Sequence, residues 1–96
     1  MFGISKKFKL FNQKFEESFE GIIEAHHFWL GKMSQFVLMK GKLREEFAEQ
    51  TGELMVTADT VLLHQKVNEK QTKKLLEIIE YWRTFLEKNN LMKYVR

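Results

Sequence analysis

The sequence lacks cysteine and proline altogether, and only five of its 96 residues are glycine. Without cysteine, the chain can form no disulfide, no thiolate metal site and no thiol nucleophile. The scarcity of turn-forming residues argues against an all-β sandwich or barrel, which needs a turn signal about every 8–12 residues. Every uncharged apolar run is shorter than the ~18 residues that a membrane span requires. We therefore expect neither an all-β fold nor a membrane-spanning helix.

What the chain does contain is typical of a folded domain. Apolar residues make up 44% of it and charged residues 30%, with nine phenylalanines and two tryptophans. So much aromatic surface is unfavourable in water, which argues against disorder. The first fifteen residues interleave lysine with phenylalanine, whereas a secretory signal has an unbroken apolar core. The sequence predicts a single cytoplasmic domain over residues 1–96, with attachment to the periphery of a membrane as an alternative.

Apolar side chains recur at every seventh position through the first half of the chain: Phe8, Phe15, Ile22, Trp29, Phe36 and Leu43. A second apolar series, from Phe11 to Phe47, follows three or four residues behind the first. This spacing is typical of a long amphipathic helix in a coiled coil. It predicts a helix over about residues 5–49, which would be roughly 65 Å long. The Ser5 hydroxyl could cap its first turn.

Thr51-Gly52 is the strongest turn signal in the chain and predicts a turn near residues 50–53. Beyond it, apolar residues resume helical spacing, most clearly from Leu75 to Leu86. We expect a second helical arm over about residues 53–89 and a short tail over residues 90–96.

Two other positions are candidate breaks. Gly41 lies between two lysines inside the first predicted helix, and Asn68 followed by Gln71 has the spacing of a capping box. We expect an all-α fold: a long antiparallel helical hairpin that completes a bundle by self-association. The alternative is three helices, with breaks near Gly41 or Gly52 and near Asn68.

Between Ile22 and Met39, apolar residues surround the first predicted helix rather than forming one stripe. One partner arm cannot cover such a helix, so we expect a homo-oligomer, with a dimer of hairpins favoured, or a protein partner. A three-helix monomer that buries the same residues is the alternative. The predicted interaction surface comprises Ile22, Phe28, Trp29, Met33, Phe36, Val37, Met39, Ile79, Trp82 and Phe85.

Charge is unevenly distributed. Residues 1–14 carry four lysines and no acid, and residues 61–96 carry eight basic and four acidic residues, whereas residues 15–60 are net acidic. A hairpin would bring both basic ends together, away from an acidic run at Glu45, Glu46, Glu49 and Glu53. The predicted basic pole comprises Lys6, Lys7, Lys9, Lys14, Lys88, Lys93 and Arg96. It could attract an anionic membrane or nucleic acid, although neither is the favoured partner, or the charges could simply keep the chain soluble.

One local pattern suggests metal binding. Glu24 and His27 have the Glu-x-x-His spacing found in di-iron helical bundles, and a turn near Gly52 would place Glu77 and Glu80 opposite them. The seven-residue register, however, turns both Glu24 and His27 away from the core. We therefore expect no metal and no cofactor.

No nucleophile elbow, phosphate-binding glycine loop or zinc motif is present in the sequence. We therefore predict a non-enzymatic helical interaction or adaptor protein that acts by self-association and helix-face packing against a protein partner. The alternative is a peripheral membrane or nucleic-acid accessory protein that docks through the basic pole.

Overall fold

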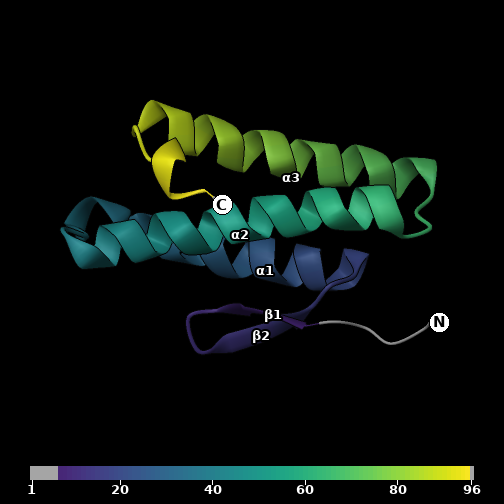
Figure 1. Cartoon of the computed structure of the whole chain (residues 1–96), viewed down its shortest axis with the longest axis horizontal. Helices are drawn as coiled ribbons and strands as arrows, with labels where there is room; N and C mark the ends of the chain where they lie inside the picture. Colours follow the sequence, from purple (N-terminus) through teal and green to yellow (C-terminus); the bar gives the residue numbers. More distant parts are fainter. Residues whose placement is uncertain (1–6, 96) are drawn as a thin grey trace.

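The computed structural model describes residues 7–95. In this range the chain is mostly helical, and its largest elements are the helices α1 (Phe19–Lys32), α2 (Lys42–His64) and α3 (Glu69–Lys88). A β-hairpin, formed by β1 (Lys7–Leu10) and β2 (Gln13–Glu16), precedes them. Two 3-10 segments, η1 (Met33–Leu38) and η2 (Met92–Tyr94), follow α1 and α3. Figure 1 shows α2 between α3 on one side and α1 with the hairpin on the other.

The all-α prediction is therefore right in outline, but the chain is not a helical hairpin. The helix expected over residues 5–49 is replaced by the β-hairpin, α1, η1 and the beginning of α2. Of the two architectures considered, the three-helix alternative is closer, with breaks near Gly41 and Asn68. The predicted cap at Ser5 lies outside the described residues.

The geometry of the hairpin explains why its apolar residues have the seven-residue spacing of a coiled-coil helix. Side chains from Lys7 to Leu10 alternate between exposed and buried, which is the period of a strand. The two-residue turn places Phe8 opposite Phe15, with their ring centroids 6.0 Å apart. A seven-residue spacing thus arises from two paired strands as readily as from two helical turns.

The turn of the hairpin holds Phe11 in an uncommon conformation. Its φ is +55°, a region that bulky residues rarely adopt. The Phe11 ring lies 4.8 Å from the ring of Trp29, centroid to centroid, and its backbone N–H donates to Oε1 of Gln50 at 3.3 Å. Contacts to α1 and α2 therefore fix the turn in place.

The chain passes directly from β2 into α1. The Ser18 hydroxyl caps the helix by accepting from the Gly21 backbone N–H at 3.1 Å. A Cβ on Gly21 would lie 1.8 Å from the Glu16 carbonyl oxygen. Only glycine allows this close approach of strand and helix.

α2 is continuous through the predicted turn at residues 50–53. The Thr51 hydroxyl donates to the carbonyl oxygens of Phe47 and Ala48, so it is satisfied inside the helix. A Cβ on Gly52 would lie 3.1 Å from Cγ2 of Val95. This glycine serves close packing of the C-terminal segment rather than a change of direction, and for that reason the turn prediction was wrong.

The second half of the chain agrees better with the prediction. Asn68 and Gln71 form a reciprocal capping box at the start of α3. The helix ends at Lys88, and Asn90 has a φ of +58°, a conformation that asparagine tolerates. The turn between two antiparallel helices, which the sequence predicts near Gly52, is made by residues 65–68 instead.

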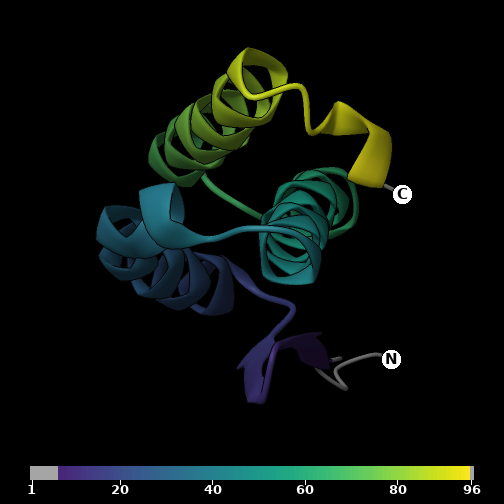
Figure 2. The ribbon, with the colours of Figure 1, turned by 90° about the vertical axis from the view of Figure 1, so that its left-hand side faces the viewer.

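The core lies among the three helices. Trp29 of α1, Phe47 of α2 and Trp82 of α3 are fully buried. α2 is its centre, because it packs against α1, α3, β1 and η2. Figure 2, viewed along the long axis, shows these elements grouped around α2.

Candidate interaction surface at one end of the bundle

The single chain covers most of the predicted interaction surface by itself. Six of its members are buried in the core: Ile22, Trp29, Phe36, Met39, Ile79 and Trp82. Phe28, Met33 and Phe85 are partly buried against it, and Val37 is exposed. Six of these residues therefore need no second copy to cover them. The hairpin and the helix α3 supply the missing cover.

An exposed apolar pair lies in the connection between α1 and α2. Val37 and Leu38 are each 77% exposed, although their neighbours Phe36 and Met39 are buried. The Met39 backbone N–H donates to the Phe36 carbonyl oxygen at 3.0 Å, which closes the last turn of η1. The two buried side chains thus hold the intervening pair outward. We call Val37 and Leu38 the apolar tip, and Figure 1 places η1 at one end of the molecule.

Basic residues flank the apolar tip in the sequence. Residues 25–44 contain four basic residues and no acidic residue. Lys40 and Lys42 are exposed, Arg44 lies over the Phe36 ring at 4.2 Å, and Lys32 lies over the Phe28 ring at 5.3 Å. Both salt bridges found within residues 7–95 are formed elsewhere, along α3. The four cations thus precede or follow the apolar tip in the sequence, and two exposed acids, Glu45 and Glu46, come directly after Arg44.

The predicted basic pole is divided between distant elements. Lys7, Lys9 and Lys14 are on the hairpin, whereas Lys88 ends α3 and Lys93 is in η2. Figure 1 shows the hairpin and α3 on opposite sides of α2. Lys6 and Arg96 lie outside the described residues. The turn near Gly52 that was expected to join the two groups is absent from α2.

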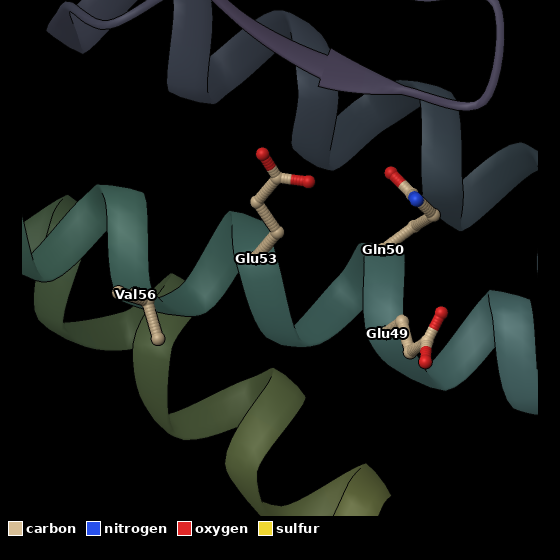
Figure 3. A pocket seen from close by; sticks show the side chains of 4 residues that line it. All are labelled: Glu49, Gln50, Glu53 and Val56. Carbon is tan, nitrogen blue, oxygen red and sulfur yellow. The ribbon is translucent and has the colours of Figure 1, made fainter. Parts of the chain in front are cut away.

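The acidic run lies on α2 rather than at a turn. A hollow of about 320 Å³ is lined by Glu49, Gln50, Glu53 and Val56. Figure 3 shows Gln50 and Glu53 directed from α2 toward the hairpin, and Glu49 directed away from them. Gln50 is the residue that accepts from the Phe11 backbone. This face of α2 therefore helps to seat the hairpin.

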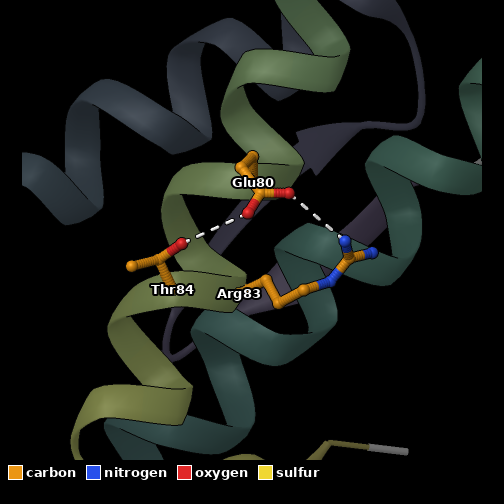
Figure 4. Close-up of polar contacts among 3 residues, drawn as sticks. All are labelled: Glu80, Arg83 and Thr84. Atoms are coloured by element: carbon orange, nitrogen blue, oxygen red, sulfur yellow. Dashed lines mark hydrogen bonds and ion pairs between the residues drawn. The ribbon is translucent and has the colours of Figure 1, made fainter.

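The metal hypothesis required acids from two helices. Glu24 and His27 are exposed on α1. On α3, Glu77 pairs with Lys74 at 4.0 Å, and Glu80 pairs with Arg83 at 3.3 Å and accepts from the Thr84 hydroxyl (Figure 4). Within residues 7–95, no three histidine or acidic side chains gather in a way that could hold a metal ion.

His26, the residue before His27 in α1, has a structural role. It is buried, and its Nδ1 accepts a hydrogen bond from the Trp82 indole N–H at 3.0 Å. Burial, together with the positive charges of His27 and Lys74, lowers the pKa of His26 to about 4. The neutral ring is needed because only an unprotonated Nδ1 can accept.

Comparison with protein-family models, curated proteins and solved structures finds no match for this chain. Across the part of the chain that the structure describes, no helix has both the length and the apolarity needed to cross a bilayer. The site must therefore be interpreted from its own chemistry.

The sequence prediction included Val37 but missed the rest of this site. The seven-residue pattern predicts one continuous helix through this segment, and such a helix would have no tip. The segment contains Leu38, Lys40, Lys42 and Arg44. A signal was present in the sequence, because residues 25–44 lack any acid while flanking segments are rich in glutamate.

Proposed function

We propose that this protein is a non-enzymatic docking protein that attaches to an anionic membrane surface through the apolar tip and its cations. The observation that carries the proposal is the exposed Val37–Leu38 pair at one end of the molecule, flanked in the sequence by Lys32, Lys40, Lys42 and Arg44. A lipid surface offers phosphate and carboxylate groups outside and an apolar layer beneath them. Tip and surface therefore match in both charge and polarity.

The energies involved are sufficient for reversible attachment. Each lysine or arginine near an anionic membrane contributes about 1 kcal/mol. Burying a valine or leucine side chain completely contributes about 1.5–3 kcal/mol, and the tip has two such side chains, mostly exposed. The charged and the apolar contributions together therefore give reversible rather than permanent attachment.

A second copy of the chain fits the tip less well. A stable protein interface buries at least about 1,000 Å² in total, which two side chains cannot provide. A protein partner would also need a socket shaped to Val37 and Leu38, whereas a lipid layer adapts to them.

The test is co-sedimentation with vesicles at low ionic strength. We expect the protein to bind vesicles of phosphatidylcholine mixed with phosphatidylserine, and to bind vesicles of phosphatidylcholine alone far more weakly. Replacing Lys40 and Lys42 together with glutamine should weaken binding by about thirtyfold, from two charges at about 1 kcal/mol each. Replacing Val37 and Leu38 with serine should weaken it by at least about tenfold.

Matched controls lie at the other end of the bundle. Lys70 and Lys73 are exposed at the start of α3, and Leu63 and Leu76 are 69% and 51% exposed. Changing these pairs to glutamine and serine makes the same alteration of net charge and likewise replaces two exposed apolar side chains. Equal losses in the control and tip variants would contradict docking through the tip. A mass in solution that rises with concentration, and falls in the serine variant of the tip, would assign the tip to self-association instead.

A further inference from the structure

The β-hairpin has one face against the helices and one face toward solvent. Phe8 and Leu10 are buried, and Phe15 is partly buried against the core, so these three form the inner face. Because side chains alternate along a strand, the residues next to them lie on the outer face. All of these are exposed: Lys7, Lys9, Lys14 and Glu16. Figure 2 shows the hairpin at the edge of the molecule, with the helices to one side of it.

The register places two like charges directly opposite each other on this outer face. Lys9 of β1 is the cross-strand partner of Lys14 of β2, and residues in this position have their Cβ atoms about 4.5–5.5 Å apart. Like charges directly opposite each other destabilise a pair of strands. Both salt bridges that the described residues form lie on α3, so neither lysine takes part in them. An anion bound across the pair would remove the repulsion.

Positive charge and hydrogen-bond donors continue along the hairpin. Lys7 lies two residues before Lys9, about 6.6 Å along the strand, although Glu16 opposite it balances part of its charge. At the turn, Asn12 and Gln13 are exposed, and amide side chains donate to phosphate oxygens. Each strand has 4 residues, so the outer face is roughly 13 Å long. A flat array of this length suits a partner with repeating negative charges better than a single small anion.

We propose that the outer face of the hairpin binds the phosphate backbone of double-stranded DNA without reading its sequence. Duplex DNA carries one negative charge per about 1.7 Å of its axis, so a stretch as long as the hairpin presents roughly eight phosphates. The major groove admits a two-stranded β-ribbon, and the phosphates on its sides relieve the repulsion between Lys9 and Lys14. Residues 7–16 contain no arginine, the residue that makes the commonest specific base contact. This binding is separate from membrane docking, because it uses a different element and needs no lipid.

The test is the fluorescence anisotropy of a short labelled duplex of mixed sequence, titrated with the full chain at several salt concentrations and without vesicles. Each lysine–phosphate contact steepens the fall of log affinity with log salt by about 0.9. Replacing Lys9 and Lys14 together with glutamine should therefore lower this slope by about 1.8. Over a fivefold rise in salt, the wild-type chain should then lose about twentyfold more affinity than the variant. The variant should fold at least as stably as wild type, because it lacks the repulsion, and urea unfolding checks this.

Two further variants complete the test. Lys70 and Lys73 are exposed at the start of α3, and replacing both with glutamine removes the same net charge but should keep the wild-type slope. Glu16→Gln leaves Lys7 without an opposing acid and should strengthen DNA binding. An unchanged slope in the hairpin variant, an equal reduction in the α3 control, or no DNA binding at low salt would overturn the proposal. A hairpin variant that keeps DNA binding but loses vesicle binding would also overturn it, because the face would then belong to lipid.

Discussion

The buried His26–Trp82 pair makes the stability of this protein depend on pH in a way that one substitution can isolate. In the fold, His26 has its pKa lowered to about 4 from an ordinary value of 6.5. The unfolded chain therefore binds more protons than the folded chain between these values. The contribution of neutral His26 to the free energy of unfolding is fully present above about pH 6.5, and it is lost progressively as the pH falls toward 4. Protonation also removes the lone pair with which Nδ1 accepts from Trp82.

The magnitude follows from the two pKa values. At pH 5 the imidazole is almost wholly charged in the unfolded chain and mostly neutral in the fold. With 1.36 kcal/mol for each pKa unit, this difference lowers the free energy of unfolding by about 2 kcal/mol relative to pH 7.5. The full loss, below pH 4, is about 3 kcal/mol.

The assay is urea unfolding followed by circular dichroism at pH 7.5 and at pH 5. Other groups also titrate over this interval, so the wild-type chain is compared with His26→Gln. The glutamine side-chain oxygen can accept from the Trp82 indole and does not titrate. We expect the loss between the two pH values to be about 2 kcal/mol smaller in His26→Gln.

A neighbouring substitution supplies the control. His27→Gln removes a smaller cause of the lowered pKa of His26 but leaves the burial of His26, which is the larger cause. This variant should retain most of the pH dependence. If wild type and His26→Gln lose the same stability between pH 7.5 and pH 5, His26 is not a buried neutral acceptor and the reasoning is refuted.

Three further predictions concern stability and can be checked by thermal or urea unfolding. Gly41 has a φ of +58°, whereas Gly31 lies within α1 with open space around its Cβ position. Gly41→Ala should lower the free energy of unfolding by about 1–3 kcal/mol, and Gly31→Ala should raise it by about 0.5–1 kcal/mol. Equal effects would show that Gly41 is not in this conformation. Asn68→Ala removes the cap of α3 and should lower the free energy of unfolding by about 1 kcal/mol. No loss would show that Asn68 does not cap the helix. Trp29→Glu buries an unpaired charge at a cost of several kcal/mol, so helicity should be lost; retained helicity would place Trp29 outside the core.

The helix α3 could be predicted from the sequence because local signals there agree with one another. Its apolar residues from Leu75 to Leu86 follow helical spacing, and Asn68 with Gln71 marks its start. The beginning of the chain could not be predicted in this way. Phe8, Phe15 and Ile22 fit one seven-residue series, yet the first two face each other across a hairpin and the third lies in α1. Periodicity alone cannot separate these cases when the strands are short.

The candidate site depends on distant parts of the chain and was therefore harder to predict. Val37 had been included for its apolar character, but its exposure follows from the burial of Phe36 and Met39 on either side. The pairing of His26 with Trp82 joins residues 56 positions apart. Gly52 was misinterpreted because glycine serves both turns and close packing, and only the position of Val95 distinguishes the two uses.

The central place of α2 has a consequence for how the protein can be divided. This one helix packs against α1, α3, β1 and η2. A fragment that lacks even one of these four elements therefore leaves part of α2 uncovered. The backbone amides in its middle, from Phe47 to Ala58, should then exchange with deuterium only when the whole chain unfolds, whereas those of the hairpin and η2 can exchange through smaller openings. Limited proteolysis should accordingly yield either the intact chain or small peptides, with no stable two-helix fragment between them.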